Sequence, residues 1–281
     1  MKILFIYNKR AGKKFETSIV NQIKELLPQS YDFYFVDIRK FESFDTTTFL
    51  TLVAIGGDGT VNTVAKRCNN QNCTLGIIPK GSGDGLARFL GIPRHVHKAM
   101  DTILYGSKIN IDTAQISDTF FINVAGAGFE ADVAHRFGTK GVRGLIGYTR
   151  AVFDLFGTKN EHEVTLTIDG KKSSLPFFSL TIANGAQWGN NFEIASAADI
   201  QDGMLDIAIM RKPKWYQFIS LISFLRTKKQ ENNSLFTFYK ASALEIENSG
   251  KKWHIDGEPV MLKDKNKVLL HSKSLNVIIP K

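Results

Sequence analysis

The stretch Ile55-Gly56-Gly57-Asp58-Gly59-Thr60 places a glycine turn directly behind the apolar run Leu52-Val53-Ala54. A second glycine turn, Pro79 to Gly85, follows the next apolar run, Thr74 to Ile78. Successive strand-to-helix turns meet at the carboxyl edge of a parallel sheet, where α/β folds bind ligands. Glycine also lets backbone N–H groups come close to a phosphate. The pair of turns therefore predicts a phosphate-binding α/β domain.

Each glycine turn carries one aspartate, Asp58 or Asp84, whose carboxylate would repel a bare phosphate. Unless these carboxylates point away, a divalent cation has to lie between carboxylate and phosphate. Thr60 stands where a helix would begin, as a cap and hydroxyl donor, and helix N-termini attract anions. Neither turn has the GxGxxG or GxxxxGK[ST] spacing, which disfavours an NAD-dependent dehydrogenase and a P-loop NTPase. The prediction is a metal–nucleotide site, and hence a kinase.

The composition is that of a soluble globular protein with room for two domains in 281 residues. Its net charge of +9 favours an acidic partner, which charge alone leaves open among nucleotide, anionic membrane surface and nucleic acid. Cys68 and Cys73 make no disulfide framework, and we expect a reducing cytoplasm. The opening MKILFIYNKR has no secretory-signal pattern, and no run is long and apolar enough for a spanning helix.

The chain changes character after Gly106. Before it, strand-like and helix-like segments alternate, as in a parallel sheet, and the last helix of this part is expected over Val96 to Tyr105. After it, short β-rich runs separated by turn residues predict an antiparallel sandwich or barrel. Two helices are expected to interrupt it, Val142 to Phe156 and Trp215 to Leu225. The final run, Leu275 to Ile279, fits a strand of either domain.

Three segments of the second half combine apolar runs with charges. Asp199 to Asp206 reads on spacing alone as a solvated acidic turn, without the alternating acids of an EF-hand loop. Asp256-Gly257 is a hairpin turn that can project Asp256 and Glu258 into a cleft. The apolar segment Trp215 to Leu225 has basic residues at both ends, which suits either an anionic bilayer interface or an ordinary core helix.

Eight blocks occur in an order and spacing that resemble the soluble lipid kinases of the diacylglycerol kinase and sphingosine kinase type, over nearly the whole chain. The blocks are Asn8 to Gly12, Gly56 to Asn62 (GGDGTVN), Ile78 to Arg88, Leu90 to Pro93, Asn123 to Phe129, Ala183 to Gly185, Asp199 to Asp206 and Ile255 to Glu258. Three places depart from the family pattern. Thr63 stands where a glutamate is usual, Asp84-Gly85 replaces a common Asn-Asp pair, and Val36 to Arg39 replaces a turn that often contains threonine.

The resemblance implies an α/β plus all-β architecture. Residues 1–108 would form a phosphofructokinase-like (NAD kinase-like) nucleotide domain, joined by a returning strand over 274–281, and residues 109–273 an antiparallel β-sandwich for the lipid. It implies an ATP site that comprises Asn8, Lys9, Arg10, Ala11, Gly12, Gly56, Gly57, Asp58, Gly59, Thr60, Asn62, Lys80, Gly81 and Ser82. It also implies Mg²⁺ held by Asp199, Asp202 and the Met204 carbonyl. Glu258 would take the proton of the lipid hydroxyl, with Asp256 as its close partner.

These observations predict an ATP- and Mg²⁺-dependent lipid kinase. Its acceptor would be a hydroxyl of diacylglycerol or a related lipid, such as a sphingoid base or phosphatidylglycerol. It would be cytoplasmic and peripheral at the inner face of the cell membrane, without a nucleic-acid partner, and exposed strands of the second domain would allow a homodimer. The alternatives are an NAD kinase-like enzyme and a catalytically silent lipid-binding or regulatory protein. Asp256→Asn is expected to abolish turnover and to preserve the fold.

Overall fold

The computed structural model describes residues 2–9, 17–139, 161–185, 187–189, 192–193, 198–217, 221 and 233–281. It divides into two compact units, unit 1 (Met1–Ile111 with Lys273–Lys281) and unit 2 (Asp112–Ser272). The predicted combination of an α/β unit with an antiparallel β-sandwich is confirmed. The helix expected over residues 142–156 lies outside the described residues, as does most of 215–225, where Trp215–Gln217 forms the 3₁₀ helix η1.

Unit 1 is built on a parallel sheet. Its strands are β1 (Lys2–Tyr7), β2 (Asp32–Asp37), β3 (Thr51–Gly56), β4 (Thr74–Pro79) and the end of β18 (Lys265–Ile279), in the order β2-β1-β3-β4-β18. Its helices are α1 (Thr17–Leu26), α2 (Ile38–Phe41), α3 (Asp58–Gln71), α4 (Gly85–Phe89) and α5 (Val96–Tyr105). The final strand pairs with β4 through Asn276 and Val277, so the last residues of the chain belong to this sheet.

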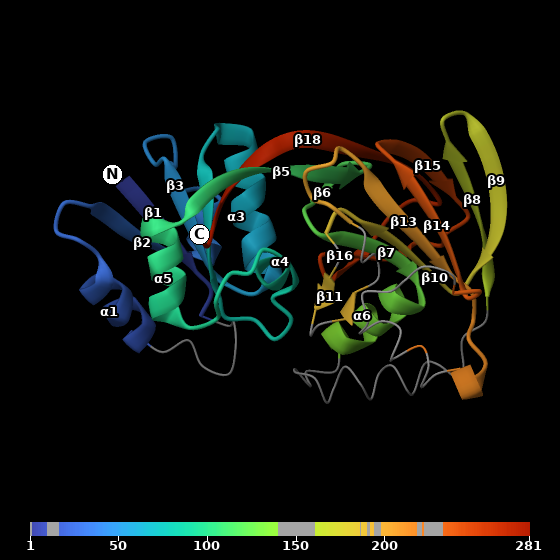
Figure 1. Ribbon diagram of the computed structural model, residues 1–281, viewed down its shortest axis with the longest axis horizontal. Helices are drawn as coiled ribbons and strands as arrows, with labels where there is room; N and C mark the ends of the chain where they lie inside the picture. The colour runs from blue at the N-terminus through green and yellow to red at the C-terminus, as the bar shows by residue number, and fades with distance from the viewer. Residues whose placement is uncertain are drawn as a thin grey trace. The chain divides into compact units, whose positions relative to one another are not determined.

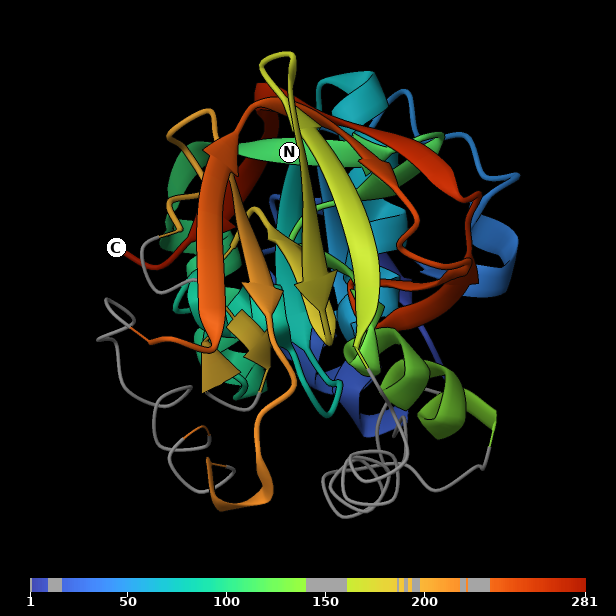
Figure 2. The same ribbon diagram turned by 90° about the vertical axis from the view of Figure 1, so that its right-hand side faces the viewer.

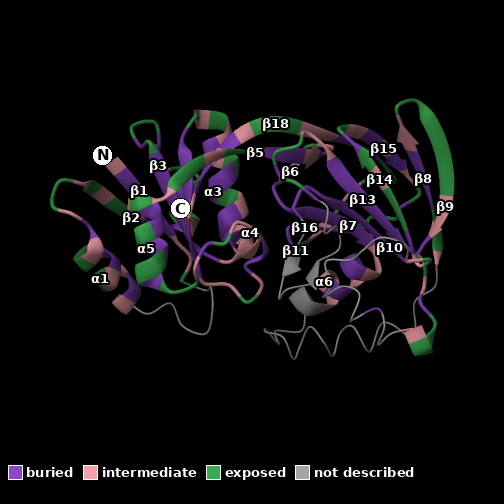
Figure 3. Cartoon of the chain, viewed as in Figure 1, coloured by how far each residue is buried: buried purple, intermediate pink, exposed green. Residues whose placement is uncertain are grey.

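The central strands of unit 1 are buried along their whole length, because helices cover the sheet (Figures 1 and 3). Parallel strands covered in this way read as continuous apolar runs, which is the pattern of β3 and β4. Helices α1 and α5 pack together and enclose one hydrophobic cluster with Phe5, Val53 and Ile78. Helix α3 packs on β3 and β4 and begins at the carboxyl end of β3.

Unit 2 is a β-sandwich, shown in Figure 2. One antiparallel sheet has the order β14-β13-β10-β7-β16-β17, with β7 (Val124–Gly128), β10 (Ser179–Ala183), β13 (Leu205–Met210), β14 (Phe236–Ala241), β16 (Lys252–Ile255) and β17 (Glu258–Met261). The other contains β8 (His162–Ile168), β9 (Lys171–Phe177), β15 (Ala243–Glu247) and the first part of β18, with β5 (Ser107–Ile116) and β6 (Thr119–Phe121) beside them. A separate small ribbon pairs β11 (Gln187–Gly189) with β12 (Phe192–Glu193).

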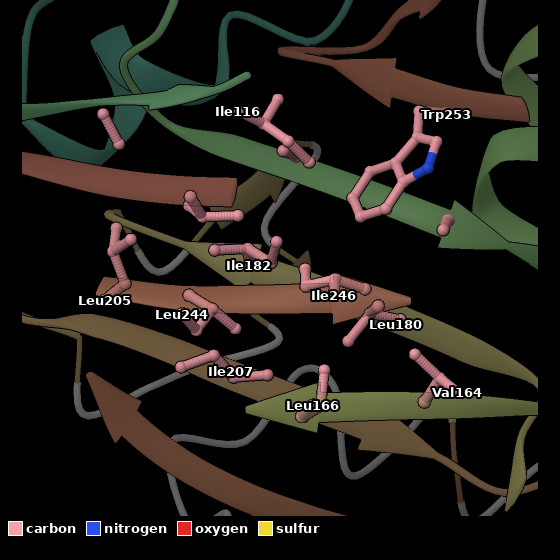
Figure 4. Packing of buried hydrophobic residues seen from close by; sticks show 14 of the residues in the cluster. Ile116, Val164, Leu166, Leu180, Ile182, Leu205, Ile207, Leu244, Ile246 and Trp253 are labelled. Carbon is pink, nitrogen blue, oxygen red and sulfur yellow. The ribbon is translucent and has the colours of Figure 1, made fainter. Parts of the chain in front are cut away.

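The core of unit 2 lies between the two layers of this sandwich. Leu180, Ile182 and Ile207 come from one layer, Val164 and Ile246 from the other, and all belong to one buried cluster (Figure 4). Trp253 of β16 is fully buried in the same cluster. Helix α6 (Phe129–Thr139) packs against β7, β16 and β17. Burial of this many large apolar side chains is the main force that holds the two sheets together.

Two elements of unit 2 differ from the expectation. Strand β7 and helix α6 were not predicted. The segment of β7, Val124–Gly128, consists of alanine and glycine apart from its first residue and therefore lacks a strand pattern. The space above Gly126 is filled by the side chains of Glu130 and His254, so a glycine is needed in the middle of this strand.

Among the described residues, no helix is long and apolar enough to span a membrane.

Candidate functional site

The first glycine loop of unit 1 joins β3 to α3. Helix α3 starts earlier than the sequence predicts, at Asp58, with Gly57 as its N-cap, and the Gly57 carbonyl accepts the N–H groups of Thr60 and Val61 at 2.9 and 3.1 Å. The predicted cap at Thr60 is therefore wrong: Thr60 lies inside the first turn, buried against Gly56. The first turn of a 14-residue helix leaves N–H groups without helical partners, which is the requirement for anion binding.

The second glycine loop packs directly on the first. The Lys80 N–H donates to the Gly56 carbonyl at 2.8 Å. A Cβ atom added to Gly81 would lie 2.6 Å from the Gly57 Cα, and one added to Gly57 would lie 3.0 Å from the Gly81 Cα. Both glycines are therefore required for the contact between the two loops. The sequence analysis expected these glycines to let the backbone approach a phosphate. In the structure, Gly57 and Gly81 let the two loops approach each other.

Both aspartates of these loops bind the second loop, Asp58 from the first loop and Asp84 from within the second. The Asp58 Oδ1 accepts the Gly85 N–H at 2.8 Å, so the first loop holds the second. The Asp84 Oδ1 accepts the Gly81 N–H at 2.8 Å, and its Oδ2 lies 3.0 Å from the Arg94 Nε. Burial raises the pKa of Asp84, and the hydrogen bond from Gly81 and the Arg94 charge oppose that shift. The sequence analysis required a cation unless the carboxylate pointed away from the phosphate. The Asp84 carboxylate does point away, because it is buried in the protein.

The remaining predicted ATP contacts differ in what the structure shows of them. Asn8 approaches Thr60, with 3.5 Å between Nδ2 and Oγ1, which brings the end of β1 to the start of α3. Lys9 and Ser82 are exposed, and Asn62 and Lys80 are half-buried. Arg10, Ala11 and Gly12 lie outside the described residues. Thr63, the family departure in α3, donates to the Gly59 carbonyl at 2.9 Å.

Arg94 is a residue that the sequence interpretation missed. Besides its ion pair with Asp84, it donates from Nη2 to the Gly81 carbonyl at 2.6 Å. Arg88 supports the same loop by donating to the Gly83 carbonyl at 2.8 Å. The only advance signal was Asp84 itself, because a buried carboxylate requires a cation or several donors.

In unit 2, the predicted hairpin turn at Asp256-Gly257 is confirmed. Asp256 and Gly257 have φ values of 48° and 87°, the positive pair of a type I′ turn between β16 and β17. The Asp256 carboxylate is buried and accepts three backbone N–H groups, from Ile122 at 3.1 Å and from Asn123 and Val124 at 2.9 Å each. Asp256 thus fixes the segment that enters β7.

Glu258 differs from its neighbour in exposure. It is the first residue of β17, and its side chain is exposed to solvent. The turn therefore carries one carboxylate that is bound to the backbone and one that solvent can reach. A group that accepts a proton from a substrate has to be reachable by that substrate, a condition that Glu258 satisfies.

Asn184 and Asp112 close the network around the same segment. Asn184 is fully buried and donates from Nδ2 to the carbonyls of Asp112 and Ile122 at 2.8 and 2.6 Å. The N–H groups of Asn184 and Gly185 donate to the Asn123 carbonyl. The Asn184-Gly185 block of the sequence thus binds the segment before β7 through hydrogen bonds. The contact of Asn184 with Asp112 was not predicted.

The three predicted magnesium ligands lie on the turn before β13. Asp199 Oδ1 accepts the Gln201 N–H at 3.0 Å, and Asp202 Oδ1 accepts the Met204 N–H at 2.9 Å. The Asp202 Oδ2 lies 2.9 Å from the Lys240 Nζ. The described residues contain no cluster of three or more His, Cys, Asp or Glu side chains suited to a metal ion. In this arrangement the donors do not fit Mg²⁺, because a lysine ammonium already binds the central carboxylate.

Comparisons with known proteins agree with this architecture. Residues 2–116 match the family model of the diacylglycerol kinase catalytic domain, and residues 123–277 match that of the YegS C-terminal NAD kinase beta sandwich-like domain. The matches thus define a kinase that consists of an α/β catalytic domain and a β-sandwich domain.

The chain belongs to the diacylglycerol kinase and YegS-like lipid kinase family, and so to the transferases. It is 30% identical to a diacylglycerol kinase of Bacillus subtilis (strain 168) over 218 residues, 75% of this chain and 71% of that protein. It is 31% identical to a Citrobacter koseri protein named "Probable lipid kinase YegS-like" over 75% of this chain and 72% of the other. A crystal structure of a diacylglycerol kinase from Bacillus anthracis str. Sterne has the same fold, with a TM-score of 0.75, 19% identity and coverage of 99% and 96% of the two chains.

Proposed function

We propose that this kinase transfers the γ-phosphoryl group of ATP, supplied as its Mg²⁺ complex, to a free hydroxyl of diacylglycerol or a related lipid alcohol. The observation that carries the proposal is the pair of interlocked glycine loops at the start of α3, within the part that matches a diacylglycerol kinase catalytic domain. The name of the Bacillus subtilis relative supports diacylglycerol as the acceptor.

The nucleotide contacts in this proposal are backbone groups of the two loops, with a few polar side chains beside them. The segments Gly56 to Asn62 and Lys80 to Ser82 would receive the phosphates, and Asn8 and Lys9 would border them. N–H groups at the start of α3 neutralise part of the phosphate charge without a reorganisation of the loops. The Lys80 ammonium adds a positive charge next to the transferred group. Phosphoryl transfer depends mainly on this kind of alignment and charge neutralisation.

On the acceptor side, Glu258 is the proton acceptor in the proposal. As the lipid hydroxyl oxygen forms its bond to the γ-phosphorus, the bond from that phosphorus to the β–γ bridging oxygen breaks and ADP leaves. The hydroxyl proton passes to the Glu258 carboxylate, which releases it to solvent. Asp256 supports this step by holding the hairpin turn, since its oxygens accept three backbone N–H groups.

Contact with an anionic membrane surface is the third part of the proposal. Trp215 and Tyr216 are consecutive and expose 84% and 58% of their surface. The exposed Lys214 lies beside them, with its Nζ 5.9 Å from the Tyr216 ring centroid. Exposed aromatic rings next to a lysine suit the boundary between acyl chains and anionic headgroups. The lipid substrate would be taken from such a surface.

The decisive experiment incubates the purified protein with γ-labelled ATP and Mg²⁺, using diacylglycerol, sphingosine, phosphatidylglycerol and NAD as separate acceptors. Label is expected in diacylglycerol or another lipid, and Glu258→Gln is expected to lower turnover about 10²- to 10⁴-fold. Glu163→Gln, at an exposed position of β8, is the matched control and should keep full activity. Label in NAD but in no lipid would overturn the proposal, and lipid binding without any transfer would point to a catalytically silent protein.

A further inference from the structure

The acidic turn before β13 encloses a lysine ammonium between two carboxylates. Lys240 Nζ lies 2.9 Å from Asp202 Oδ2 and 3.4 Å from Asp206 Oδ2. Asp206 is buried on β13, and Lys240 is its direct partner on β14 in the antiparallel register. The strand pairing therefore places the lysine side chain opposite Asp206, from where it reaches Asp202 on the turn.

Two further carboxylate oxygens at this turn accept its backbone N–H groups, and one of them comes from outside the turn. Asp202 Oδ1 accepts the Met204 N–H, and Asp112 Oδ2 accepts the Gly203 N–H at 2.8 Å. The Asp112 N–H in turn donates to the Ile200 carbonyl at 2.7 Å. These hydrogen bonds hold the turn in place from both sides.

A divalent cation at Asp202 would meet the Lys240 charge at short range. Mg²⁺ demands near-octahedral coordination by oxygen atoms at about 2.0–2.1 Å, so it could bind the Asp202 Oδ2 only if the ammonium moved away. Two like charges a few ångströms apart repel each other. The ammonium neutralises the same carboxylates without any coordination geometry of this kind.

We propose that Lys240 is a built-in cation of the Asp199 to Asp206 turn and takes the place that the family resemblance assigns to Mg²⁺. Unit 2 then needs no divalent cation for its stability, and Mg²⁺ is required only with the nucleotide. The independence of unit 2 from a divalent cation concerns the stability of its fold alone. It can therefore be tested separately from the identity of the lipid substrate in the proposed function.

The test is the midpoint of thermal unfolding, Tm, of the nucleotide-free full chain in EDTA and in millimolar MgCl₂ at constant ionic strength. Wild-type Tm is expected to be the same in both buffers. Lys240→Met should lower Tm in EDTA by about 2–4 °C, because two carboxylates then lack their counter-charge. MgCl₂ should restore this loss, since Asp202 and the neighbouring carbonyl of Met204 become available to the metal.

Lys265→Met is the matched control. Lys265 lies 2.9 Å from Glu247 and 3.4 Å from Glu245, the same distances as in the Lys240 cluster, but it is not part of the acidic turn. The Tm of the Lys265→Met variant is expected to be the same in EDTA and in MgCl₂. Lys240→Arg, which keeps the charge, should behave as wild type in both buffers.

Three outcomes would overturn the proposal. One is a wild-type Tm that rises in MgCl₂ and loses that rise in Asp202→Asn. Another is a Lys240→Met variant with an unchanged Tm in EDTA, and the third is a lowered Tm that MgCl₂ does not restore. Should Lys240→Met fail to fold, calorimetric titration of MgCl₂ into nucleotide-free wild-type protein still decides. Saturable binding that Asp202→Asn abolishes contradicts the built-in cation, and its absence supports it.

Discussion

The glycine loops of unit 1 and the Asp256 hairpin of unit 2 use acidic side chains in different ways. In unit 1, both aspartates accept backbone N–H groups of the second loop, and Asp84 is almost fully buried. In unit 2, Asp256 accepts three backbone N–H groups, but Glu258, two residues further on, is exposed. Short acidic side chains in tight turns readily bond to nearby backbone, whereas the longer Glu258 side chain stays open to solvent.

The largest stability effect is expected where the two loops of unit 1 touch. Gly81→Ala would place a methyl group 2.6 Å from the Gly57 Cα, so one backbone has to move. We expect a loss of about 3 kcal/mol in the free energy of unfolding, together with weaker ATP binding. Urea unfolding and titration with a fluorescent ATP analogue would measure both.

Gly83→Ala is the control in the same loop. Its new methyl group would meet only a carboxylate oxygen of Asp58, at 3.1 Å, so the expected loss is smaller. Equal effects of the two substitutions would show that general loop flexibility matters, rather than the contact between Gly57 and Gly81.

The second prediction tests whether Asp256 is held to the backbone as tightly as its contacts indicate. In Asp256→Asn, the amide group replaces one carboxylate oxygen, so at least one of the N–H groups of residues 122–124 loses its acceptor. We expect a loss of about 2 kcal/mol in the free energy of unfolding in addition to lower turnover. The sequence predicts that Asp256→Asn preserves the fold, whereas the contacts of Asp256 lead us to expect this of Glu258→Gln instead.

Both variants should be compared by urea unfolding and by initial rates. Glu258→Gln is expected to unfold as wild type does, because its exposed side chain has no buried role. A fully stable Asp256→Asn protein without activity would return Asp256 to the chemical step and contradict the positioning role.

The third prediction concerns the ion pair that supports the second glycine loop. Arg94→Met leaves the buried Asp84 without its cation. Since Arg94 itself is half-exposed, solvent compensates part of the loss, and we expect about 1 kcal/mol in the free energy of unfolding. Double-mutant analysis with Asp84→Asn measures the coupling, which should be clearly smaller in high salt. Strict additivity of the two substitutions would rule the interaction out.

Much of the fold could be predicted from periodicity. The helix Val96–Tyr105 was predicted to the residue, since apolar spacing determines it. Strand β7 was missed because Gly126 is explained only by Glu130 and His254, which approach from other elements. The two glycine loops were predicted to lie at one edge of the sheet, but the contacts of Arg94 and Lys240 were not predicted, because they follow from tertiary structure and strand register.

The last prediction concerns pH and the buried pair Glu130–His254, which lies beside Gly126 in unit 2. Glu130 Oε2 lies 3.2 Å from His254 Nε2, and its Oε1 accepts the Thr181 hydroxyl at 2.9 Å. Burial raises the pKa of Glu130, while the charge and hydrogen bond of His254 oppose that shift. The folded state therefore holds the Glu130 proton more tightly than the unfolded state does.

It follows that Glu130 stabilises the fold most below its usual pKa of about 4.3, and that this contribution is lost as pH rises through the raised value. Glu130→Gln cannot ionise, so wild-type stability should fall relative to this variant as pH rises above about 4.3, with a slope of at most 1.36 kcal/mol per pH unit. Urea unfolding across this range measures the difference, with Glu163→Gln as an exposed control. A difference that does not change with pH would mean that Glu130 titrates alike in the folded and unfolded chains. The hydrogen bonds and the charge that oppose the effect of burial on Glu130 would then balance it.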